Sequence, residues 1–295
     1  MAQGNVIPTS AAGGPSRLPA RSLGAILVDA GRLKPADTDR ILRFQQERGL
    51  QFGDAALELG LLTRADIDFA LSQQFQHPYL ERGQSLIRGE VVAAYSPFGR
   101  QVEGLRALRN QLLIRWFESD PAHTGLAIVS AGRGEGRSFI AANLAVLFSQ
   151  LGERTLLVDA DMRSPAQHLL FGFDNRAGLS ALLSGRGGPD LIRRVPSLPE
   201  LCVLPAGAQP PNPSELLARS VFARFVQQMA GEFDVVLFDT PAAGEWPEAL
   251  TVCLRAGAGL IVVRKNATRT WRVRGVADGA AQSSAVIIGT VLNNH

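Results

Sequence analysis

The sequence has little cysteine and no long apolar run, and each shortage excludes a class of protein. Cys202 and Cys253 are the only cysteines, and their apolar surroundings are typical of small core residues in a reducing compartment. No metal-ligand spacing occurs. The N-terminus lacks the apolar region of a signal peptide, and no run approaches the roughly 18 apolar residues of a membrane span. We therefore expect a cytoplasmic protein.

Charge of one sign is also scarce, since the formal net charge is +3 and the sequence pI is about 9.3. Because no basic patch is interleaved with aromatic residues, we expect no nucleic acid partner. Basic residues do gather in one stretch near the end of the chain. We interpret it as a solvated face, with an acidic partner or a membrane surface as the alternative. It comprises Arg264, Lys265, Arg269, Arg272 and Arg274.

The 295 residues, 46% of them hydrophobic, are enough for two folded domains. Residues 1–20 are rich in Gly, Pro, Ser and Ala and are predicted to form a flexible tail. An internal repeat follows, in which residues 23–45 align with residues 52–74. Each copy predicts two helices, the first ending at a glycine, Gly31 or Gly60. We therefore predict a small all-α tandem-repeat domain over residues 21–80.

The repeat pattern of Leu-Gly, Gly-x-Leu and a closing Gln resembles the N-terminal domain of type II secretion and pilus ATPases. Some members of that family bind cyclic di-GMP through an Arg two places before the first glycine of a copy. Here those places hold Ser22 and Gln51, and Arg21 lies one step too early. A protein-interaction domain is therefore favoured over a cyclic di-GMP site, although that ligand stays an alternative.

Residues 81–118 are predicted to form a linker followed by a helix from about Gly99 to Phe117. The helix carries Glu103, Arg106 and Arg109 at three-residue spacing, which places the three charges along one stripe. Taken alone, such a stripe is typical of a solvated helix face.

From residue 119 to the end, apolar strands alternate with amphipathic helices. Strands are predicted at 125–130, 155–160, 200–204, 234–239, 258–263 and 286–292, and helices at 138–151, 213–230, 246–256 and 269–281. This alternation predicts an α/β fold with a mainly parallel sheet. Ligands of such sheets bind at the carboxyl ends of the strands.

A glycine-rich loop follows the first of these strands. Glycines let backbone N–H groups turn inward, and the next helix directs its positive dipole end to the same point, as a polyphosphate site requires. The loop fits the Walker A pattern, with Arg137 in the Lys position and Ser138 after it. A glycine turn that binds no nucleotide is the alternative. The loop residues are Gly132, Arg133, Gly134, Glu135, Gly136, Arg137 and Ser138.

Carboxylates end two of the predicted strands. Asp159 and Asp161 follow the second strand, and Asp239 ends the fourth. A single Asp in such a place is commonly a turn or cap residue. Three of them beside a glycine loop supply the hard oxygen ligands that Mg²⁺ needs with a nucleotide. The sequence therefore predicts binding of ATP and Mg²⁺.

The loop, the segment around Asp159, Asp161 and Arg163, the segment FDVVLFDTP and the last two strands together resemble the bacterial tyrosine kinases of exopolysaccharide clusters. The resemblance covers residues 100–295. It implies a P-loop NTPase fold of the deviant-Walker, MinD/ParA-like type. It also implies tyrosine kinase activity, an integral-membrane polysaccharide co-polymerase as partner and a location peripheral to the inner membrane. In that family Glu-x-x-Arg-x-x-Arg mediates self-association, which implies this role for Glu103, Arg106 and Arg109.

The resemblance also implies roles for single residues. Backbone amides of the loop would bind the phosphates, with Arg137 in place of the usual Lys, and the catalytic set would be Arg137, Asp159, Asp161 and Asp239. Ser138, Asp161 and Asp239 would hold the metal. Asn293 is a candidate for the nucleotide base.

Two features depart from the family pattern, namely Arg137 and the lack of a tyrosine-rich tail. Tyr79 and Tyr95 are the only tyrosines, so an acceptor must be one of these or a residue of another protein. Three functions stay open: a tyrosine kinase regulating exopolysaccharide chain length or export, an ATP-switched adaptor of the export machinery that transfers no phosphate, and a ParA-like ATPase that positions cargo.

Overall fold

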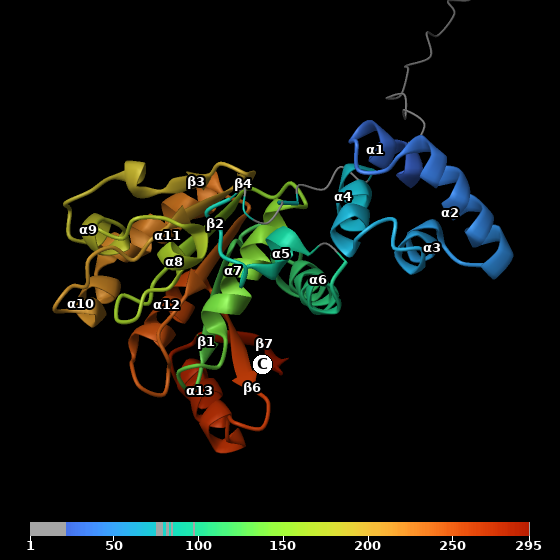
Figure 1. Ribbon diagram of the computed structural model, residues 1–295. Helices are drawn as coiled ribbons and strands as arrows, with labels where there is room; N and C mark the ends of the chain where they lie inside the picture. Colours follow the sequence, from blue (N-terminus) through green and yellow to red (C-terminus); the bar gives the residue numbers. More distant parts are fainter. Residues whose placement is uncertain (1–21, 75–78, 81–82, 84, 97, 295) are drawn as a thin grey trace, which may run out of the picture. The chain divides into compact units, whose positions relative to one another are not determined.

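The computed structural model describes residues 22–74, 79–80, 83, 85–96 and 98–294 (Figure 1), and the predicted tail of residues 1–20 lies outside this range. The chain divides into two compact units, Met1–His77 and Pro78–His295. Each unit has a hydrophobic core of its own. Among the described residues, no helix is both long and apolar enough to cross a membrane.

The described residues of the first unit form four helices, of which the first packs against the fourth and the second against the third. They are α1 (Leu23–Asp29), α2 (Pro35–Arg48), α3 (Phe52–Glu58) and α4 (Arg64–Gln74). The predicted glycines follow the first helix of each copy in the left-handed conformation, with φ of 69° at Gly31 and 63° at Gly60. Pro35 occupies the first turn of α2, where its missing N–H costs nothing. The two repeat copies therefore fold alike, as their sequences predict.

Reciprocal hydrogen bonds fix the start of α4. The Thr63 hydroxyl accepts a hydrogen bond from the Asp66 amide at 3.3 Å, and Asp66 accepts one from the Thr63 amide at 2.9 Å. This is a capping box, which satisfies two N–H groups that the helix leaves open. Asp66 also pairs with Arg32 of the first copy at 3.1 Å, so the cap links the two copies.

The second unit begins with a segment that was predicted as a linker and that packs into the core. Ile87, Val91 and α5 (Val92–Tyr95) are part of the main hydrophobic cluster. Asn143 fixes this segment, because its side chain accepts a hydrogen bond from the Ala93 amide at 2.8 Å and donates one to the Glu90 carbonyl at 3.1 Å. The predicted helix Gly99–Phe117 is α6 (Arg100–Leu112) followed by a π-helical turn, η1 (Leu113–Phe117).

A seven-stranded sheet forms the centre of the second unit (Figure 1). Its order is β3-β4-β2-β5-β1-β6-β7. All neighbouring strands are parallel except β3 and β4. The strands are β1 (Gly125–Ser130), β2 (Thr155–Asp159), β3 (Arg193–Val195), β4 (Leu198–Leu204), β5 (Val235–Asp239), β6 (Ala258–Arg264) and β7 (Val286–Asn293).

Helices cover both faces of the sheet. One cluster joins α7 (Arg137–Ser149) with α5 and α6, and the second joins the helices of the opposite face to the strands. Because the central strands β1, β2 and β5 are buried on both sides, their sequences are nearly continuous apolar runs. The remaining helices are α8 (Gln167–Phe171), α9 (Leu179–Leu183), η2 (Pro189–Leu191), α10 (Pro213–Ala218), α11 (Ser220–Glu232), α12 (Glu248–Ala256) and α13 (Thr270–Gln282).

The predicted α/β fold is confirmed. Besides the short helices α8, α9 and η2, which were not predicted, two further details differ. The helix predicted over 213–230 is two helices, because Arg219 has an extended conformation (φ −67°, ψ 153°) that ends α10 and precedes α11. The antiparallel strand β3 was not predicted. It is three residues long and pairs with β4 across a register shift, so it has no apolar run to reveal it.

Candidate phosphate and metal site

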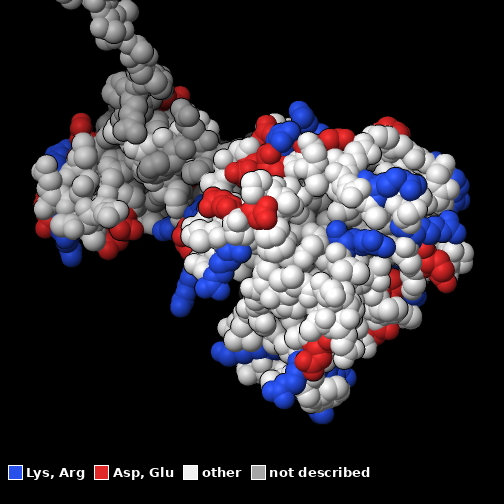
Figure 2. All heavy atoms as spheres, turned by 180° about the vertical axis from the view of Figure 1, so that it is seen from behind, with Lys and Arg blue, Asp and Glu red and all other residues white. Residues whose placement is uncertain are grey.

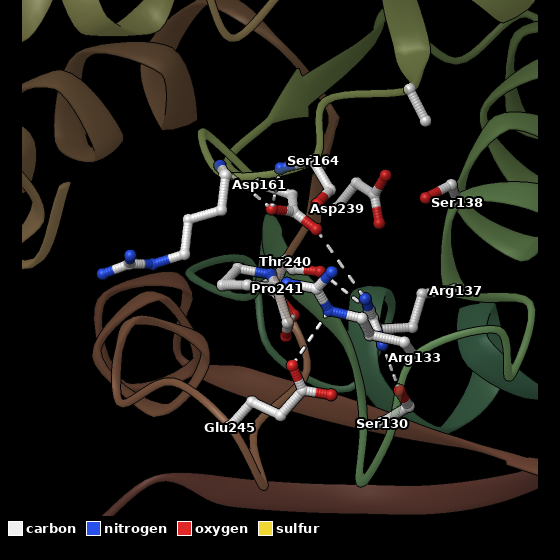
Figure 3. A network of polar contacts seen from close by, with 12 residues as sticks. Ser130, Arg133, Arg137, Ser138, Asp161, Ser164, Asp239, Thr240, Pro241 and Glu245 are labelled. Atoms are coloured by element: carbon white, nitrogen blue, oxygen red, sulfur yellow. Dashed lines mark hydrogen bonds and ion pairs between the residues drawn. The ribbon is translucent and has the colours of Figure 1, made fainter. Parts of the chain in front are cut away.

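The predicted site residues meet at the carboxyl ends of β1, β2 and β5 (Figure 3). A cavity of about 280 Å³ opens there between the glycine-rich loop, the turn after β2 and the turn after β5. Its lining carries three arginines and one carboxylate. The lining residues are Arg133, Gly134, Arg137, Ser138, Asp161, Arg163, Ser164, Pro241, Ala242 and Trp246.

The loop backbone needs glycine at two positions. Gly134 and Gly136 have φ of 70° and 95°, a region that other residues rarely occupy. Gly136 is the N-cap of α7. A Cβ atom at Gly136 would lie 2.1 Å from the Asn293 Nδ2 atom. The helix therefore starts with exposed amides on a turn that only glycine fits, which is the arrangement that binds phosphate groups.

Side chains from several elements stabilise this loop through hydrogen bonds and an ion pair. Glu135 is buried and accepts hydrogen bonds from the Ala131 amide at 3.1 Å and the Thr268 hydroxyl at 2.6 Å. Asn293 donates from Nδ2 to the Glu135 carbonyl at 3.1 Å. Arg133 pairs with Glu245 at 2.9 Å (Figure 3). Glu135 and Asn293 thus hold the loop conformation, and the structure places Asn293 against the loop backbone.

Arg137 points into the site and is 8% exposed. Its Nε donates to the Thr240 carbonyl at 2.7 Å, and its Nη1 donates to the Gly132 carbonyl at 2.9 Å and to the Ser130 hydroxyl (Figure 3). Its Nη2 lies 3.7 Å from Asp161. The planar guanidinium therefore connects the loop to the ends of β1 and β5, which a Lys ammonium could not do at as many points.

Asp161 faces the cavity from the turn after β2. One carboxylate oxygen accepts hydrogen bonds from the amides of Arg163 and Ser164, at 3.2 and 2.9 Å. The other oxygen is the one that approaches Arg137. Asp161 thus has one oxygen fixed by the backbone and one directed at the site, as a group that acts on a ligand requires.

Asp159 lies two residues earlier and has different surroundings. It is fully buried and accepts hydrogen bonds from the amides of Asp161, Ala166 and Gln167, at 2.9–3.2 Å. Burial and the charge of neighbouring Asp239 raise the pKa of its carboxyl well above the usual value. Through these hydrogen bonds Asp159 stabilises the turn that carries Asp161. Asp159 itself is not among the residues that line the cavity.

Asp239 pairs in register with Asp159 on the adjacent strand and is fully buried. Its Oδ2 accepts a hydrogen bond from Gln167 Nε2 at 2.8 Å. Its Oδ1 has no hydrogen-bond partner among the described residues. Burial raises the pKa of Asp239 to about 6, against the opposing charge of Arg137. A buried carboxylate oxygen left open in this way is costly unless a ligand or water meets it.

The donor set around Asp239 fits a magnesium ion. Ser138, Asp161 and Asp239 offer one hydroxyl and two carboxylates, all of them hard oxygen donors. Among the described residues, no group of three or more acidic, His or Cys side chains forms a ready metal cluster. Mg²⁺ binds few protein oxygens and completes its shell with phosphates and water, so one hydroxyl and two carboxylates are a sufficient protein share.

The sequence analysis missed several residues that shape the site. Ser130 and Gln167 bind Arg137 and Asp239 directly. Glu248 is 1% exposed and binds Arg163 at 2.6 Å, and the Arg163 guanidinium stacks on the Trp246 ring at 3.5 Å. No local signal marks them, because Glu248 lies 85 residues from its partner and resembles an ordinary acidic residue at the start of a helix.

The charged residues of the α6 stripe form hydrogen bonds and an ion pair with other residues of the chain. Arg106 contacts Glu103 and donates to the Tyr79 hydroxyl. Arg109 is buried and donates to the Leu147 carbonyl of α7 at 3.2 Å and to the Asn110 side chain at 2.8 Å. Glu103 is the most exposed residue of the stripe, with a side chain that is 58% exposed. Of the three predicted interface residues, Glu103 is therefore the most accessible to another molecule.

The basic stretch before and within α13 is exposed, and Arg264 Nη1 lies 3.4 Å from the Gly134 carbonyl of the loop. Arg272 stacks on Trp271, which is 64% exposed. Figure 2 shows acidic and basic side chains interspersed over one face of the molecule. On that face the charges do not form a continuous basic surface.

The fold and the site together define a class of protein. The second unit is a P-loop NTPase of the deviant-Walker, MinD/ParA-like type, with a mostly parallel sheet and a small helical region before it. The septum site-determining protein MinD of Pyrococcus horikoshii has this fold, with 24% identity, a TM-score of 0.51 and coverage of 58% of this chain and 70% of that chain. The family model for the cellulose biosynthesis protein BcsQ matches residues 124–285.

The chain belongs to the bacterial tyrosine-protein kinase family. It is 30% identical over 212 residues to the tyrosine-protein kinase YwqD of Bacillus subtilis, which covers 72% of this chain and 88% of that protein. The chimerical protein CapA2B2 has a TM-score of 0.66 with 31% identity, over 77% of this chain and 99% of that chain. The kinase domain of Escherichia coli tyrosine kinase ETK has a TM-score of 0.68 with 28% identity, over 73% and 83% of the two chains.

Other relatives are much longer than this chain. The match covers 26% of the tyrosine-protein kinase Ptk of Acinetobacter johnsonii and 35% of Wzc of Salmonella typhimurium. The chain therefore spans about a quarter to a third of the length of these relatives.

Proposed function

We propose that the chain is an ATP-dependent protein tyrosine kinase that regulates exopolysaccharide chain length or export. The observation that carries the proposal is the convergence of Arg137, Ser138 and Asp161 on one cavity at the carboxyl edge of a P-loop sheet. Asp239, with an open buried oxygen, ends the adjoining strand. The names of the relatives favour a kinase over an adaptor that transfers no phosphate.

Each loop residue has a role in this proposal. The backbone amides of residues 132–138 cradle the phosphates, because Gly134 and Gly136 turn the chain around them. Arg137 supplies the positive charge that Lys supplies in other Walker A loops. Bound ATP would supply the phosphoryl group, and Mg²⁺ would neutralise part of its charge. Asn293 stays a candidate neighbour of the nucleotide base.

The three carboxylates have separate roles in metal binding, in contact with the tyrosine hydroxyl and in support of the turn after β2. Ser138, Asp161 and Asp239 would hold the metal, with Gln167 orienting Asp239. Asp161 also has the oxygen directed at the site, so it can accept a hydrogen bond from the incoming tyrosine hydroxyl. Asp159 holds the Asp161 turn in place through its hydrogen bonds to backbone amides. Positioning and charge neutralisation account for most of the catalysis in such chemistry.

The remaining parts of the proposal concern partners. A family described as a cellulose biosynthesis protein matches the chain, which supports a task in polysaccharide production. We infer a cytoplasmic protein that reaches the inner membrane through a membrane co-polymerase. Self-association would use Glu103, Arg106 and Arg109. The helical repeat unit would serve protein interaction, with cyclic di-GMP as the alternative ligand.

The test is phosphate transfer from ATP to tyrosine. Purified full-length chain is incubated with γ-labelled ATP, Mg²⁺ and poly(Glu,Tyr), and phosphotyrosine is measured beside released phosphate. We expect label on tyrosine in the wild type, no label above background in Asp161→Ala, and label retained in Arg137→Lys.

The outcomes separate the two leading functions. Equal label in Asp161→Ala would refute the assigned role of that residue. ATP-dependent self-association without phosphotyrosine would identify the chain as an adaptor. Asp190→Ala, at an exposed carboxylate away from the cavity, is the matched control and should label like the wild type.

A further inference from the structure

The two tyrosines of the chain have different surroundings. Tyr95 lies in α5 against the main hydrophobic cluster, and its hydroxyl donates to the Ile87 carbonyl at 2.5 Å. Tyr79 is half-buried, and its hydroxyl accepts a hydrogen bond from Arg106 Nη2. One phenol is therefore held by the backbone, and the other by a charged side chain.

Two guanidinium groups act on Tyr79. Burial raises the pKa of its hydroxyl, while the positive charges of Arg106 and Arg109 oppose that rise. Among the described residues, Glu103 is the one acidic group whose charge acts on Tyr79, and it is paired with Arg106. The raised pKa keeps the phenol neutral at physiological pH, and two of the three described charges that act on it are positive.

This environment suits a phosphate group. A guanidinium binds phosphate through parallel N–H groups, and such bonds are stronger than those between neutral groups. Arg106 would supply the hydrogen bonds, because its present partners, Glu103 and Tyr79, are side chains that can move. Arg109 is fixed on Leu147 and Asn110 and would contribute mainly its charge.

We propose that Tyr79 is a phosphorylation site of this chain and that Arg106 binds the phosphate, while Arg109 adds positive charge beside it. The inference rests on the proposed kinase function, and the phosphoryl donor is ATP. The Tyr79 oxygen forms a bond to the γ-phosphorus, the bond from that phosphorus to the bridging oxygen breaks, and ADP leaves with the electron pair. The phenolic proton passes to solvent.

The modification would change the charge of the α6 stripe. A phosphotyrosine carries about −1.5 to −2 charges at pH 7. It would compete with Glu103 for Arg106 and repel the Glu103 carboxylate, which is already largely exposed. Arg106 would then be neutralised and Glu103 released.

The first experiment maps the phosphate. Full-length wild type, Tyr79→Phe and Tyr95→Phe are incubated with ATP and Mg²⁺, and intact mass and peptide fragmentation locate the phosphate. We expect one phosphate on Tyr79 in the wild type, none at that site in Tyr79→Phe, and an unchanged phosphate on Tyr79 in Tyr95→Phe.

Adding poly(Glu,Tyr) to the wild-type sample distinguishes a failure of the Tyr79 inference from a failure of the proposed kinase function. Label on the polymer with no phosphate on Tyr79 overturns this inference and leaves the kinase function standing. No phosphotyrosine on either overturns the kinase function and this inference with it. Phosphate on Tyr95 alone also overturns the inference.

A second experiment tests the arginine pair without relying on the chain's own activity. Phosphotyrosine is incorporated at position 79 during translation, and phosphorus NMR follows its second ionisation. Two nearby guanidinium groups should lower that pKa by about half a unit or more. Arg106→Gln should remove most of the shift, while Arg100→Gln, an exposed basic residue on the same helix, should leave it.

Two results would contradict the arginine pair. A second ionisation like that of free phosphotyrosine would show that no guanidinium reaches the phosphate. The same shift in Arg106→Gln would show that the phosphate lies elsewhere.

Discussion

The glycine loop and the α6 stripe both place an arginine beside a carboxylate, but they hold it in different ways. Arg137 is buried and bound mainly by the carbonyls of Gly132 and Thr240 and the Ser130 hydroxyl. Arg106 is bound by the side chains of Glu103 and Tyr79. An arginine held by backbone has one geometry, whereas an arginine held by side chains can change partners. The first suits a fixed reaction site and the second suits regulation.

The largest effect should come from removing the backbone-held arginine. Arg137→Ala leaves buried carbonyls and Asp161 without their partner, so we expect the free energy of unfolding to fall by about 3 kcal/mol. Chemical denaturation measures this change. Arg133→Ala is the matched control, because Arg133 and Glu245 form an exposed pair that should contribute less than about 1 kcal/mol. Equal losses in the two variants would remove the distinction between fixed and exposed arginines.

The next effect concerns activity alone. Asp161→Asn keeps the shape of the side chain but removes the charge that faces Arg137 and the cavity. We expect the rate of phosphate transfer to fall roughly 100-fold or more, since the charge acts on the reacting groups. Steady-state kinetics on poly(Glu,Tyr) provide the measurement, with Asp190→Asn as control. A fall of less than tenfold would place the catalytic carboxylate elsewhere.

A smaller effect should follow a change in the loop backbone. Gly136→Ala puts a Cβ atom at a φ of 95° and 2.1 Å from Asn293 Nδ2. The left-handed conformation alone costs about 1–2 kcal/mol, and the contact with Asn293 adds to it. In an Asn293→Gly background, which lacks the contact, Gly136→Ala should cost less stability than it does in the wild type. Equal costs in the two backgrounds would show that the contact with Asn293 carries none of the loss.

The smallest effect is expected on the stripe. Arg106→Ala removes an ion pair with the exposed Glu103 and a hydrogen bond to the Tyr79 hydroxyl, so the free energy of unfolding should fall by about 1 kcal/mol. The change should shrink further in high salt, because exposed charges are screened. A loss as large as that of Arg137→Ala would mean that Arg106 is a structural residue, which would argue against a role as a switch.

Much of the fold follows from local pattern. The six predicted strands lie within two residues of the observed ones. The signal is clearest for β1, β2 and β5, because strands of a parallel sheet that are buried on both faces are apolar throughout. The repeated helical hairpins were predicted because their turns use glycine and proline at fixed places. Strand β3 was not predicted, because two of its three residues are arginines at the edge of the sheet. The break at Arg219 has no Gly or Pro to mark it.

The sequence predicted many of the residues that lie at the site, but it did not predict the separate role of each residue. Asp159 and Asp161 look equivalent in the sequence, yet the first lies under the turn and the second faces the cavity. The difference depends on how the turn after β2 folds back on the backbone amides of residues 166 and 167. Glu248 and Gln167 act over long sequence separations, so only the folded chain brings them to the site.

A crystal structure of the chain with a non-hydrolysable ATP analogue and Mg²⁺ tests the proposed nucleotide site most directly. We expect the phosphates to lie against the amides of residues 132–138. We also expect the metal near Ser138, Asp161 and Asp239, with Arg137 still bound to the Thr240 carbonyl. Nucleotide bound outside this cavity, or an Arg137 side chain turned away from both the loop and the phosphates, would contradict the proposed site.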